Sequence, residues 1–400
     1  MRLVYVLNNL FCCRWPVALR LGPVLLLALS LSGCLPDGPT AVITPDTPPI
    51  SVTVSPPVPS TVVPPFVYVG SLDGSLYALD TATGAPRWVF RADTAIQSSP
   101  ALANGLVYVG SNGGSLYALD ALTGAMRWRF AGEGSFYASP AVADGLVYIG
   151  SQEGQFYAVD AYTGAIRWLY KRGLGFFSSP TVAGGLVYVG SQDNTLTALQ
   201  ATTGVVRWQF RAGLFILSSP LVAGGLIYVG SADRNLYALD ALTGAQRWAA
   251  PTGGAVESSP VVVGAVVYVG SNDGYVYAFD AVSGARRWRF QTGDVVRSSP
   301  VVAGNTLYIG GRDKVLYALD ATTGQRRWAF STRYDIYATP ALANGTVYVG
   351  STDETFYALV ASTGRLRWQY RTQGFIVGSA AVVQRPGTPV FYPALSGMTN

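Results

Sequence analysis

The sequence predicts an all-β fold, an eight-bladed β-propeller of four-stranded antiparallel blades with a 40-residue repeat. The first observation is that a segment such as VYVGSLDGSLYALDTATGAPRWVF recurs eight times at this fixed spacing. The second is that every copy is filled with short strand-like runs and turn dipeptides, which is typical of propeller arrays. The register of the repeats is marked by Trp88, Trp128, Trp168, Trp208, Trp248, Trp288, Trp328 and Trp368.

Each repeat contains four strand-like runs, as the second copy illustrates. The predicted strands cover Ser98–Leu102, Leu106–Gly110, Ser115–Leu119 and Arg127–Phe130. The turns between the first three carry Asn-Gly or Gly-Gly, which supply the positive φ that tight hairpins need. Four short antiparallel strands form one blade, and eight blades close a ring that leaves few exposed sheet edges.

Aromatic residues recur at fixed positions of the second and fourth strands. A tyrosine stands at the same second-strand position of all eight copies, from Tyr68 to Tyr348. The residue two beyond each tryptophan is aromatic in seven copies and Ala250 in the other, whereas the residue between them varies freely. This period-2 alternation predicts an aromatic face turned inward. We therefore expect the eight tryptophans to be structural residues that dock one blade against the next.

The turn before each fourth strand begins with an aspartate in six copies, as in Asp120-Ala-Leu-Thr-Gly124, and with Gln200 and Val360 in the other two. The aspartate can accept backbone N–H bonds within the turn, and the glycine can take positive φ. Because these acids occupy the same turn of every blade, they are spread around the ring. We therefore expect a structural role rather than a metal collar.

The composition excludes several kinds of active site. The chain contains no histidine, which removes the commonest general base and transition-metal ligand and makes a Ser-His-Asp triad impossible. The three cysteines, Cys12, Cys13 and Cys34, all lie outside the repeats, so no thiolate site or disulfide is expected in the propeller. We expect no catalytic residue, no metal and no cofactor.

The formal net charge of +5 overstates the basic character of the mature protein. Arg2, Arg14 and Arg20 lie in a predicted signal segment, which leaves 24 of the 27 basic residues against 22 acidic ones, a net charge of +2. The remaining basic residues are spread over the repeats. Nucleic-acid binding through a basic stripe is therefore not expected.

Residues 1–33 have the pattern of a secretory signal, with three arginines before the apolar run LGPVLLLALSLSG. This run is shorter than the roughly 20 apolar residues that span a bilayer. Its end, Leu31 to Cys34, resembles a bacterial lipobox, which implies cleavage before Cys34 and lipidation of that cysteine. Leu35 stands where an aspartate would imply inner-membrane retention, so the outer membrane is favoured. The alternative is an ordinary signal peptide with an incidental cysteine.

The rest of the chain divides into a spacer and the propeller. Residues 34–65 begin with the lipidated cysteine and are rich in proline, which predicts a semi-extended spacer, and residues 66–395 are assigned to the propeller. The missing first strand of blade one can come from Thr61–Val63 or from the C-terminal Ser379–Val383. The C-terminal strand is preferred, because it ties both ends of the ring together. A further remnant, Val390-Phe391-Tyr392, resembles a second strand.

A family resemblance follows from these residues. The pattern Ala-x-Asp-x-x-Thr-Gly-x-x-x-Trp, as in Ala118–Trp128, resembles the repeat of the pyrroloquinoline-quinone (PQQ)-like propellers. The resemblance extends from residue 66 to about 383 and implies the fold rather than quinone binding. The combination of lipobox, spacer and a single eight-bladed propeller resembles the propeller lipoproteins of the outer-membrane β-barrel assembly machine.

Three functions are compatible with this resemblance. A lipid-anchored, non-enzymatic scaffold for protein–protein interaction in the cell envelope is preferred, in outer-membrane protein assembly. The alternatives are a surface-displayed binding or adhesion module and a PQQ-dependent dehydrogenase. The resemblance to the dehydrogenases implies inserted loops and adjacent cysteines over the quinone, whereas every repeat here has minimal length and Cys12–Cys13 lie in the signal. The expected partners are envelope proteins and the membrane, and the propeller is expected to be monomeric and extracytoplasmic.

The loops that enter each blade and the turns between its second and third strands are expected on one face, where most variation between repeats occurs. An apolar loop position such as Phe136 is expected in the blade stack, and the next position should face the central channel near its mouth. An apolar sector beside a charged one is typical of a protein-binding face. The predicted partner-binding residues are Tyr137, Phe177, Phe215, Leu217, Glu257, Arg297, Arg333 and Tyr337.

A hydroxyl recurs two positions after each of these mouth-facing residues, which predicts a ring of hydroxyls lower in the channel. The residues are Ser99, Ser139, Ser179, Ser219, Ser259, Ser299, Thr339 and Ser379. Small polar residues that fill a narrow, wet lumen are a more economical interpretation than a ligand site.

Overall fold

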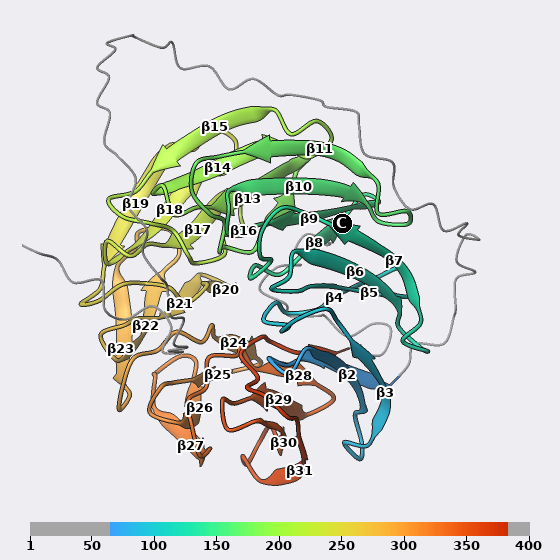
Figure 1. The fold of residues 1–400 in the computed structure, drawn as a ribbon. Helices are drawn as coiled ribbons and strands as arrows, with labels where there is room; N and C mark the ends of the chain where they lie inside the picture. Colours follow the sequence, from blue (N-terminus) through green and yellow to red (C-terminus); the bar gives the residue numbers. More distant parts are fainter. Residues whose placement is uncertain (1–64, 383–400) are drawn as a thin grey trace, which may run out of the picture. The chain divides into compact units, whose positions relative to one another are not determined.

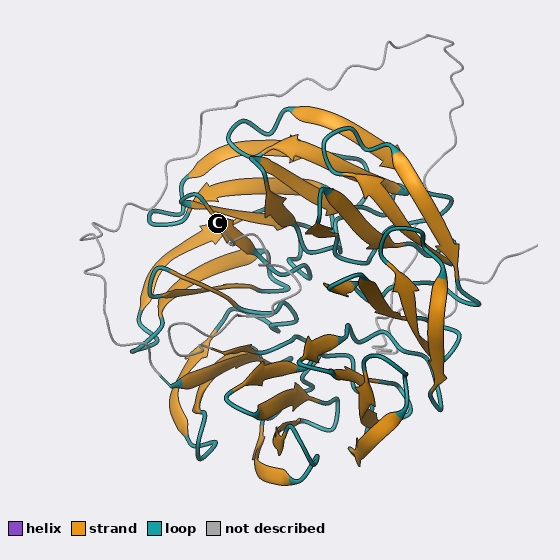
Figure 2. Ribbon diagram, turned by 180° about the vertical axis from the view of Figure 1, so that it is seen from behind, coloured by secondary structure: helices purple, strands orange, loops and turns teal. Residues whose placement is uncertain are grey.

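The computed structural model describes residues 65–382, which contain 32 strands and no helix. The strands form eight four-stranded sheets, and all strand pairs within the sheets are antiparallel. The sheets are arranged as blades around a central axis (Figures 1 and 2). This confirms the predicted eight-bladed propeller. The signal segment, Cys34, Thr61–Val63, Val390-Phe391-Tyr392 and the predicted propeller residues 383–395 lie outside the described residues.

We number the blades from the chain's first described strand. The first and second strands of blades 1 to 8 are, in order, β32 (Ala381–Val382) and β1 (Phe66–Gly70), β4 (Ala101–Ala103) and β5 (Leu106–Gly110), β8 (Ala141–Ala143) and β9 (Leu146–Gly150), β12 (Thr181–Ala183) and β13 (Leu186–Gly190), β16 (Leu221–Ala223) and β17 (Leu226–Gly230), β20 (Val261–Val263) and β21 (Val266–Gly270), β24 (Val301–Ala303) and β25 (Thr306–Gly310), and β28 (Ala341–Ala343) and β29 (Thr346–Gly350).

The third and fourth strands complete each blade toward the rim. In the same order they are β2 (Ser75–Asp80) and β3 (Pro86–Arg91), β6 (Ser115–Asp120) and β7 (Met126–Ala131), β10 (Gln155–Asp160) and β11 (Ile166–Lys171), β14 (Thr195–Gln200) and β15 (Val206–Arg211), β18 (Asn235–Asp240) and β19 (Gln246–Pro251), β22 (Tyr275–Asp280) and β23 (Arg286–Gln291), β26 (Val315–Asp320) and β27 (Arg326–Ser331), and β30 (Thr355–Val360) and β31 (Leu366–Arg371).

The predicted strands match the observed ones except at the first strand. In blade 2 the second strand has the predicted bounds, the third extends one residue further at its C-terminal end, and the fourth extends one residue further at both ends. The first strand was predicted at Ser98–Leu102 but covers only Ala101–Ala103. The prediction was wrong there because Pro100 has no N–H to donate, and Ser98 bonds to the second strand through its side chain instead.

The C-terminal segment closes the ring. Strand β32 pairs with β1 through Val67–Val382 and Tyr68–Ala381, so the last described residues supply the innermost strand of blade 1. The preference for a C-terminal closing strand is therefore confirmed. At seven of the eight junctions, from β4 around the ring to β32, the first strand of one blade also approaches that of the next, which makes these strands the innermost ring (Figure 1).

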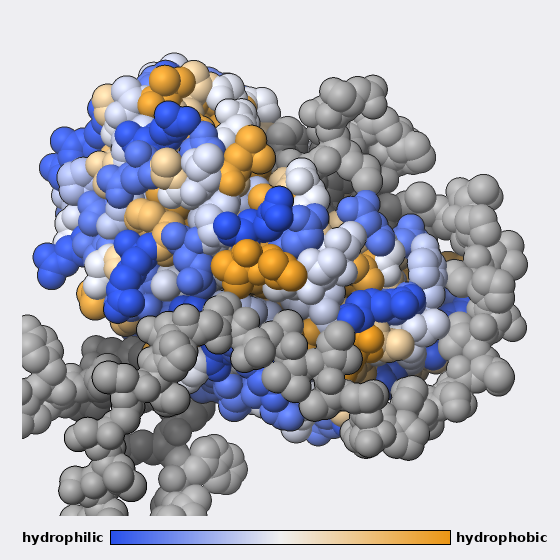
Figure 3. All heavy atoms as spheres, turned by 90° about the horizontal axis from the view of Figure 1, so that it is seen from above, coloured by the Kyte–Doolittle hydropathy of each residue, from blue (hydrophilic) through white to orange (hydrophobic). Residues whose placement is uncertain are grey.

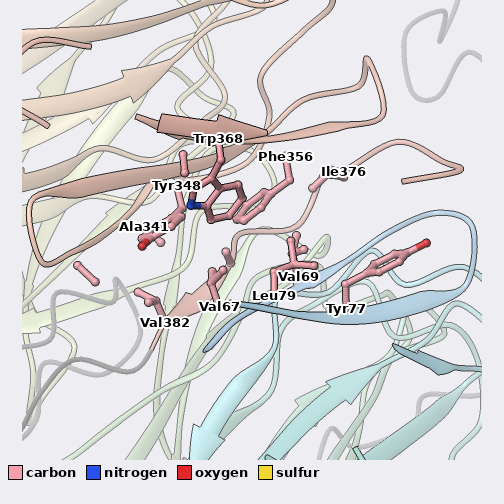
Figure 4. Close-up of a cluster of buried hydrophobic side chains, with 13 residues drawn as sticks. Val67, Val69, Tyr77, Leu79, Ala341, Tyr348, Phe356, Trp368, Ile376 and Val382 are labelled. Atoms are coloured by element: carbon pink, nitrogen blue, oxygen red, sulfur yellow. The ribbon is translucent and has the colours of Figure 1, made fainter. Parts of the chain in front are cut away.

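The hydrophobic core lies between neighbouring blades. Where blade 8 meets blade 1, Trp368 packs opposite Val67 and Leu79 (Figure 4). The indole N–H of Trp368 donates to the carbonyl of Thr81 at 3.0 Å, and the hydroxyl of Tyr348 donates to the same carbonyl at 3.3 Å. Two buried polar groups are thus satisfied by one carbonyl of the next blade, while both rings remain in the core.

Every other junction repeats this arrangement. The tryptophan and the second-strand tyrosine of one blade donate to the same alanine carbonyl of the next, which belongs to Ala121, Ala161, Ala201, Ala241, Ala281, Ala321 and Ala361 in turn. Trp128, Trp168, Trp248 and Trp368 are buried, and Trp88, Trp208, Trp288 and Trp328 are half-buried.

The outer strands leave little continuous apolar surface on the side of the propeller that Figure 3 shows, where apolar residues form small separate groups among hydrophilic ones. Within residues 65–382 there is no helix long and apolar enough to cross a membrane.

Candidate functional site

Two sets of loops share one face of the propeller, as predicted. The backbone N–H of Asn112, in the turn between β5 and β6, donates to the carbonyl of Ala95 in the preceding inter-blade loop at 2.9 Å. The same bond joins Thr352 to Asp335 at 3.0 Å, and Leu72 to Phe375 across the ring closure at 2.9 Å. The variable segments of each blade therefore form one continuous surface around the axis.

At the inner end of each of these loops, four residues before the first strand begins, one position changes in chemistry from blade to blade. The apolar position that precedes it is fully buried in the blade stack, as Phe136 and Phe176 show with 0% and 1% exposure. The next residue is half-buried in every copy. We call this set the mouth ring, and it consists of Gln97, Tyr137, Phe177, Leu217, Glu257, Arg297, Tyr337 and Val377.

One arc of the mouth ring is aromatic and apolar. The rings of Tyr137 and Phe177 stack with centroids 5.5 Å apart and planes 21° from parallel. Phe215 and Leu217 are half-buried in the next loop along the ring. The stacked pair comes from consecutive blades, so this contact depends on the ring and not on local sequence.

Two exposed leucines extend this apolar arc and were missed in the sequence. Leu174 and Leu214 occupy the tips of the two adjacent loops and are 51% and 48% exposed. The available signal was their common position, one residue after a glycine in KRGLGFF and RAGLFIL. Exposed apolar side chains on the loops that carry Phe177 and Leu217 enlarge the surface that a partner could bury.

The opposite arc of the mouth ring is charged. Arg297 pairs with Glu257 of the preceding blade at 3.1 Å between Nε and Oε2. Asn272 donates from Nδ2 to Oε1 of the same glutamate at 2.7 Å. Both partners of the ion pair are half-buried, with side-chain exposures of 28% and 19%, and the contact is an ion pair without a hydrogen bond from Nε of Arg297.

Tyr337 continues this charged arc. Its hydroxyl donates to Oδ2 of Asp335 at 3.2 Å, and Nε of Arg312 binds the same oxygen at 3.2 Å. Burial raises the pKa of Tyr337 above its ordinary value, although Arg312 opposes the shift. The tyrosine therefore stays neutral and acts as a hydrogen-bond donor.

The structure does not bring Arg333 to the mouth ring. This residue follows the outer strand β27 by two positions and is exposed. Its backbone N–H donates to Oδ2 of Asp353 at 2.9 Å. The predicted face therefore consists of seven residues on the inner loops and one arginine nearer the rim.

The turn aspartates beside this face have a structural role that sequence reasoning missed. Asp353 accepts the N–H of Thr355 at 3.0 Å, the hydroxyl of Tyr357 at 2.8 Å and the N–H of Arg333 at 2.9 Å. It thereby fastens the turn, the third strand and the inter-blade loop together. The signal was an aspartate followed four residues later by a tyrosine, which recurs at Asp73, Asp233, Asp273 and Asp313.

Seven of the eight predicted ring hydroxyls, all except that of Thr339, accept a hydrogen bond from the preceding loop. The backbone N–H of the hydroxyl-bearing residue in one loop donates to Oγ of the equivalent serine in the next at 2.8–3.1 Å. The seven bonds are Ser99–Ser139, Ser139–Ser179, Ser179–Ser219, Ser219–Ser259, Ser259–Ser299, Thr339–Ser379 and Ser379–Ser99. These serines link the blades around the axis.

Within the part of the chain that the structure describes, no group of three or more Asp, Glu, His or Cys side chains could hold a metal ion.

A comparison with family models matches most of the chain. The model described as outer membrane protein assembly factor BamB, of the PQQ_2 type, matches residues 50–137, 120–271, 212–299 and 272–397. These overlapping matches cover the whole repeat region. The chain belongs to the BamB family.

Solved structures share the fold of this BamB-family chain. The crystal structure of BamB from Moraxella catarrhalis matches with a TM-score of 0.64 and 22% identity, over 75% of this chain and 92% of that one. A computationally designed protein, Ika8, matches with a TM-score of 0.64 and 17% identity, over 71% of this chain and 89% of that one. A search of the curated proteins found no match.

Proposed function

We propose that this protein is a lipid-anchored, non-enzymatic scaffold that binds other envelope proteins and takes part in outer-membrane protein assembly. Membership of the BamB family supports a place in the cell envelope and in outer-membrane protein assembly. In this proposal residues 1–33 direct export, Cys34 carries the lipid and residues 34–65 hold the propeller away from the membrane. The partners are other subunits of the outer-membrane β-barrel assembly machine, and the propeller binds them as a monomer.

The observation that carries the proposal is the asymmetry of the mouth ring. The blades are built on one plan, so residues that differ between equivalent loops do not serve the shared fold. Tyr137, Phe177, Phe215 and Leu217 form an apolar arc, and the Glu257–Arg297 pair lies on the charged arc of the same ring. Central apolar anchors with a polar surround are typical of protein-binding surfaces.

A pair of matched double variants tests the proposal. Phe177→Asp with Leu217→Asp places two charges in the apolar arc, and it should reduce co-purification of assembly-machine subunits from the native envelope at least tenfold, because central anchors often contribute about 2 kcal/mol or more each. Leu122→Asp with Thr203→Asp places the same charges on exposed turns of the opposite face and should leave co-purification unchanged. Melting temperatures should stay close to that of the wild type in both.

The reverse result, with capture lost only in the opposite-face variant, would place the interface on the other side. Capture of unrelated surface components instead of assembly subunits would favour the adhesion alternative. Turnover of an alcohol or sugar by the purified protein with calcium and PQQ would contradict the non-enzymatic assignment.

A further inference from the structure

The turn between the third and fourth strands lies on the face opposite the mouth ring. In six blades it begins with an aspartate, and these turns show how its donors bind a carboxylate. In blade 1, Oδ1 of Asp80 accepts the N–H of Ala82 at 2.9 Å, and the N–H and hydroxyl of Thr83 at 3.0 and 3.1 Å. Oδ2 accepts a hydrogen bond from the Arg87 guanidinium at 2.6 Å. Each turn of this kind is therefore a cradle of two backbone N–H groups, one hydroxyl and one guanidinium around a carboxylate.

Six blades fill this cradle with their own acid. The pairs are Asp80–Arg87, Asp120–Arg127, Asp160–Arg167, Asp240–Arg247, Asp280–Arg287 and Asp320–Arg327, with nitrogen–oxygen distances of 2.6–2.8 Å. The recurrence shows that these donors suit a carboxylate wherever the turn forms.

In blade 8 the acid is replaced by Val360, but the turn keeps its conformation. The N–H of Gly364 donates to the carbonyl of Val360 at 2.8 Å, and the same bond from Gly84 to Asp80 is 2.9 Å long. The φ of Gly364 is 71°, and that of Gly84 is 73°. The backbone that builds the cradle is therefore present without the carboxylate.

The hydrogen-bond donors of the blade 8 turn either have no acceptor or form a long hydrogen bond. Arg367 is exposed and has no hydrogen bond or ion pair within residues 65–382, and neither has the N–H of Ser362. The N–H of Thr363 donates to the backbone carbonyl of Val360 at 3.2 Å, at the long end of the usual range, whereas the N–H of Thr83 donates to the Asp80 carboxylate at 3.0 Å. A second guanidinium, on the exposed Arg365, lies on the same turn.

Blade 4 has also lost the acid, and there the N–H of Thr203 donates to the backbone carbonyl of Gln200 at 3.2 Å, as Thr363 does to Val360 in blade 8. There the position is Gln200, whose Nε2 donates to the carbonyl of Gly185 at 3.2 Å, so a polar side chain still occupies the turn. Val360 places only an apolar side chain there. Blade 8 is thus the one described blade with the donors and with no polar side chain at the first position of the turn.

We propose that the Val360–Gly364 turn, with Arg367, binds a carboxylate supplied by a partner protein, from the side chain of an aspartate or glutamate. One carboxylate oxygen takes the N–H groups of Ser362 and Thr363 and the Thr363 hydroxyl, and the other takes the Arg367 guanidinium. Arg is suited to this role because its planar fork matches a carboxylate. The site lies on the face opposite the mouth ring, so it is separate from the surface proposed above.

The experiment uses the mature protein with Cys34→Ser, labelled with ¹⁵N, and N-acetyl-aspartate N-methylamide as the probe. Saturable shifts are expected at the amides of Ser362 and Thr363 and at Nε of Arg367. The neutral isostere N-acetyl-asparagine N-methylamide should produce none. Arg367→Gln should weaken binding about tenfold or more, as expected for loss of a hydrogen bond to a charged group. Arg367→Lys, which keeps the charge but loses the fork, should have an intermediate affinity.

Two further variants distinguish probe binding at the blade 8 turn from non-specific binding of anions elsewhere on the protein. Val360→Asp restores the acid that six sister turns carry, so it should fold normally and abolish probe binding by filling the cradle from within. Arg207→Gln removes the equivalent arginine of blade 4 and should leave binding unchanged. The proposal is overturned if Val360→Asp still binds the probe, if Arg207→Gln weakens it as much as Arg367→Gln, or if the asparagine isostere or sulfate shifts the same signals equally.

Discussion

The backbone N–H of Ser379 donates a hydrogen bond of 2.8 Å to Oγ of Ser99, across 280 residues of sequence. This bond joins the loop that precedes the last described strand to the loop that precedes blade 2. The same kind of bond joins six other pairs of consecutive loops. Here it joins the loops on the two sides of blade 1, the blade that contains both the first and the last described strands. Together with the two-residue pairing of β32 and β1, it fastens the ring at the place where the chain is not continuous.

Ser99→Ala should loosen the ring closure. The change leaves the partly buried N–H of Ser379 without its acceptor, and the loss of such a hydrogen bond costs about 1 kcal/mol. Amide hydrogen exchange at Ala381 and Val382 should accelerate, because β32 is held to β1 by only two residue pairs. Ser139→Ala is the matched control, since it removes the same bond between covalently consecutive blades and should not accelerate exchange in β32. Equal exchange in both variants would contradict a special role for Ser99.

Trp208→Ala should destabilise the fold by about 3–5 kcal/mol, the usual cost of removing a large core aromatic side chain. Trp208 packs against blade 5 and donates from its indole to the carbonyl of Ala241 at 3.1 Å. Trp208→Phe keeps most of the packing and loses this bond, so it should cost about 1 kcal/mol plus a smaller packing loss. Urea unfolding measures both. A wild-type unfolding curve for Trp208→Ala would show that the tryptophans do not dock the blades.

Gly244→Ala tests the contact between the aspartate turn and the tryptophan of the preceding blade. Gly244 has a φ of 72°, and a Cβ there would lie 2.5 Å from Cε3 of Trp208. Gly225→Ala is the control, because Gly225 has a φ of 74° but a Cβ there would meet nothing within 4 Å beyond its chain neighbours. The control should lose about 1 kcal/mol for backbone strain, and Gly244→Ala should lose clearly more. Equal losses would show that the steric contact is unimportant.

Stability should fall in acid because of the aspartate turns. The Arg247 guanidinium and the Thr243 hydroxyl lower the pKa of Asp240 from 3.8 to about 2. A carboxylate whose pKa is depressed by folding stabilises the protein fully above its unfolded pKa, and this stabilisation is lost as the pH falls through the folded value. The urea midpoint should therefore drop between about pH 4 and about pH 2.

Asp240→Asn should flatten this acid dependence, because the neutral amide cannot form the charged pair with Arg247. Asp144→Asn is a suitable control, since it removes a carboxylate from an exposed turn where other repeats carry asparagine, as at Asn104. An acid transition that is as steep in Asp240→Asn as in the control would argue that this turn does not contribute.

Cys34→Ser should release the protein from the membrane without changing the propeller. The proposed lipid is attached to this residue, and the proline-rich spacer separates it from the first described strand at Phe66. Fractionation should move the variant to the soluble fraction, and its melting temperature should match that of the detergent-solubilised wild type. A variant that has lost its signal peptide but remains in the membrane fraction would contradict lipidation.

Much of the fold could be predicted because the information is local and repeated eight times. The second strand Leu106–Gly110 has the predicted bounds, and the turn at Asp120 accepts the N–H bonds of Leu122 and Thr123 that its residue types suggested. The alternation of inward and outward side chains and the residue types of a turn depend on a few neighbouring residues. They can therefore be recognised within a single strand or hairpin. The prediction of the first strand failed because Ser98 bonds to the second strand through its side chain and not through its backbone.

The candidate site was only partly predictable. Sequence variation pointed to Tyr137 and Phe177, and the structure shows that their rings stack. Variation offered no reason to expect that Glu257 and Arg297 would pair, or that Arg333 would stay near the rim. Those outcomes depend on which loops become neighbours when blades pack.

By itself the sequence determined the repeat, the number of blades, the strand order within a blade and the residues that must face inward. The tertiary structure alone decided how the blades are joined: that β32 closes blade 1, that Ser379 bonds to Ser99, and that Trp368 donates to Thr81 across the chain ends. The physical reason is distance along the chain. Periodicity constrains neighbours a few residues apart, whereas contacts between equivalent positions of different blades exist only after the ring has closed and brought them together.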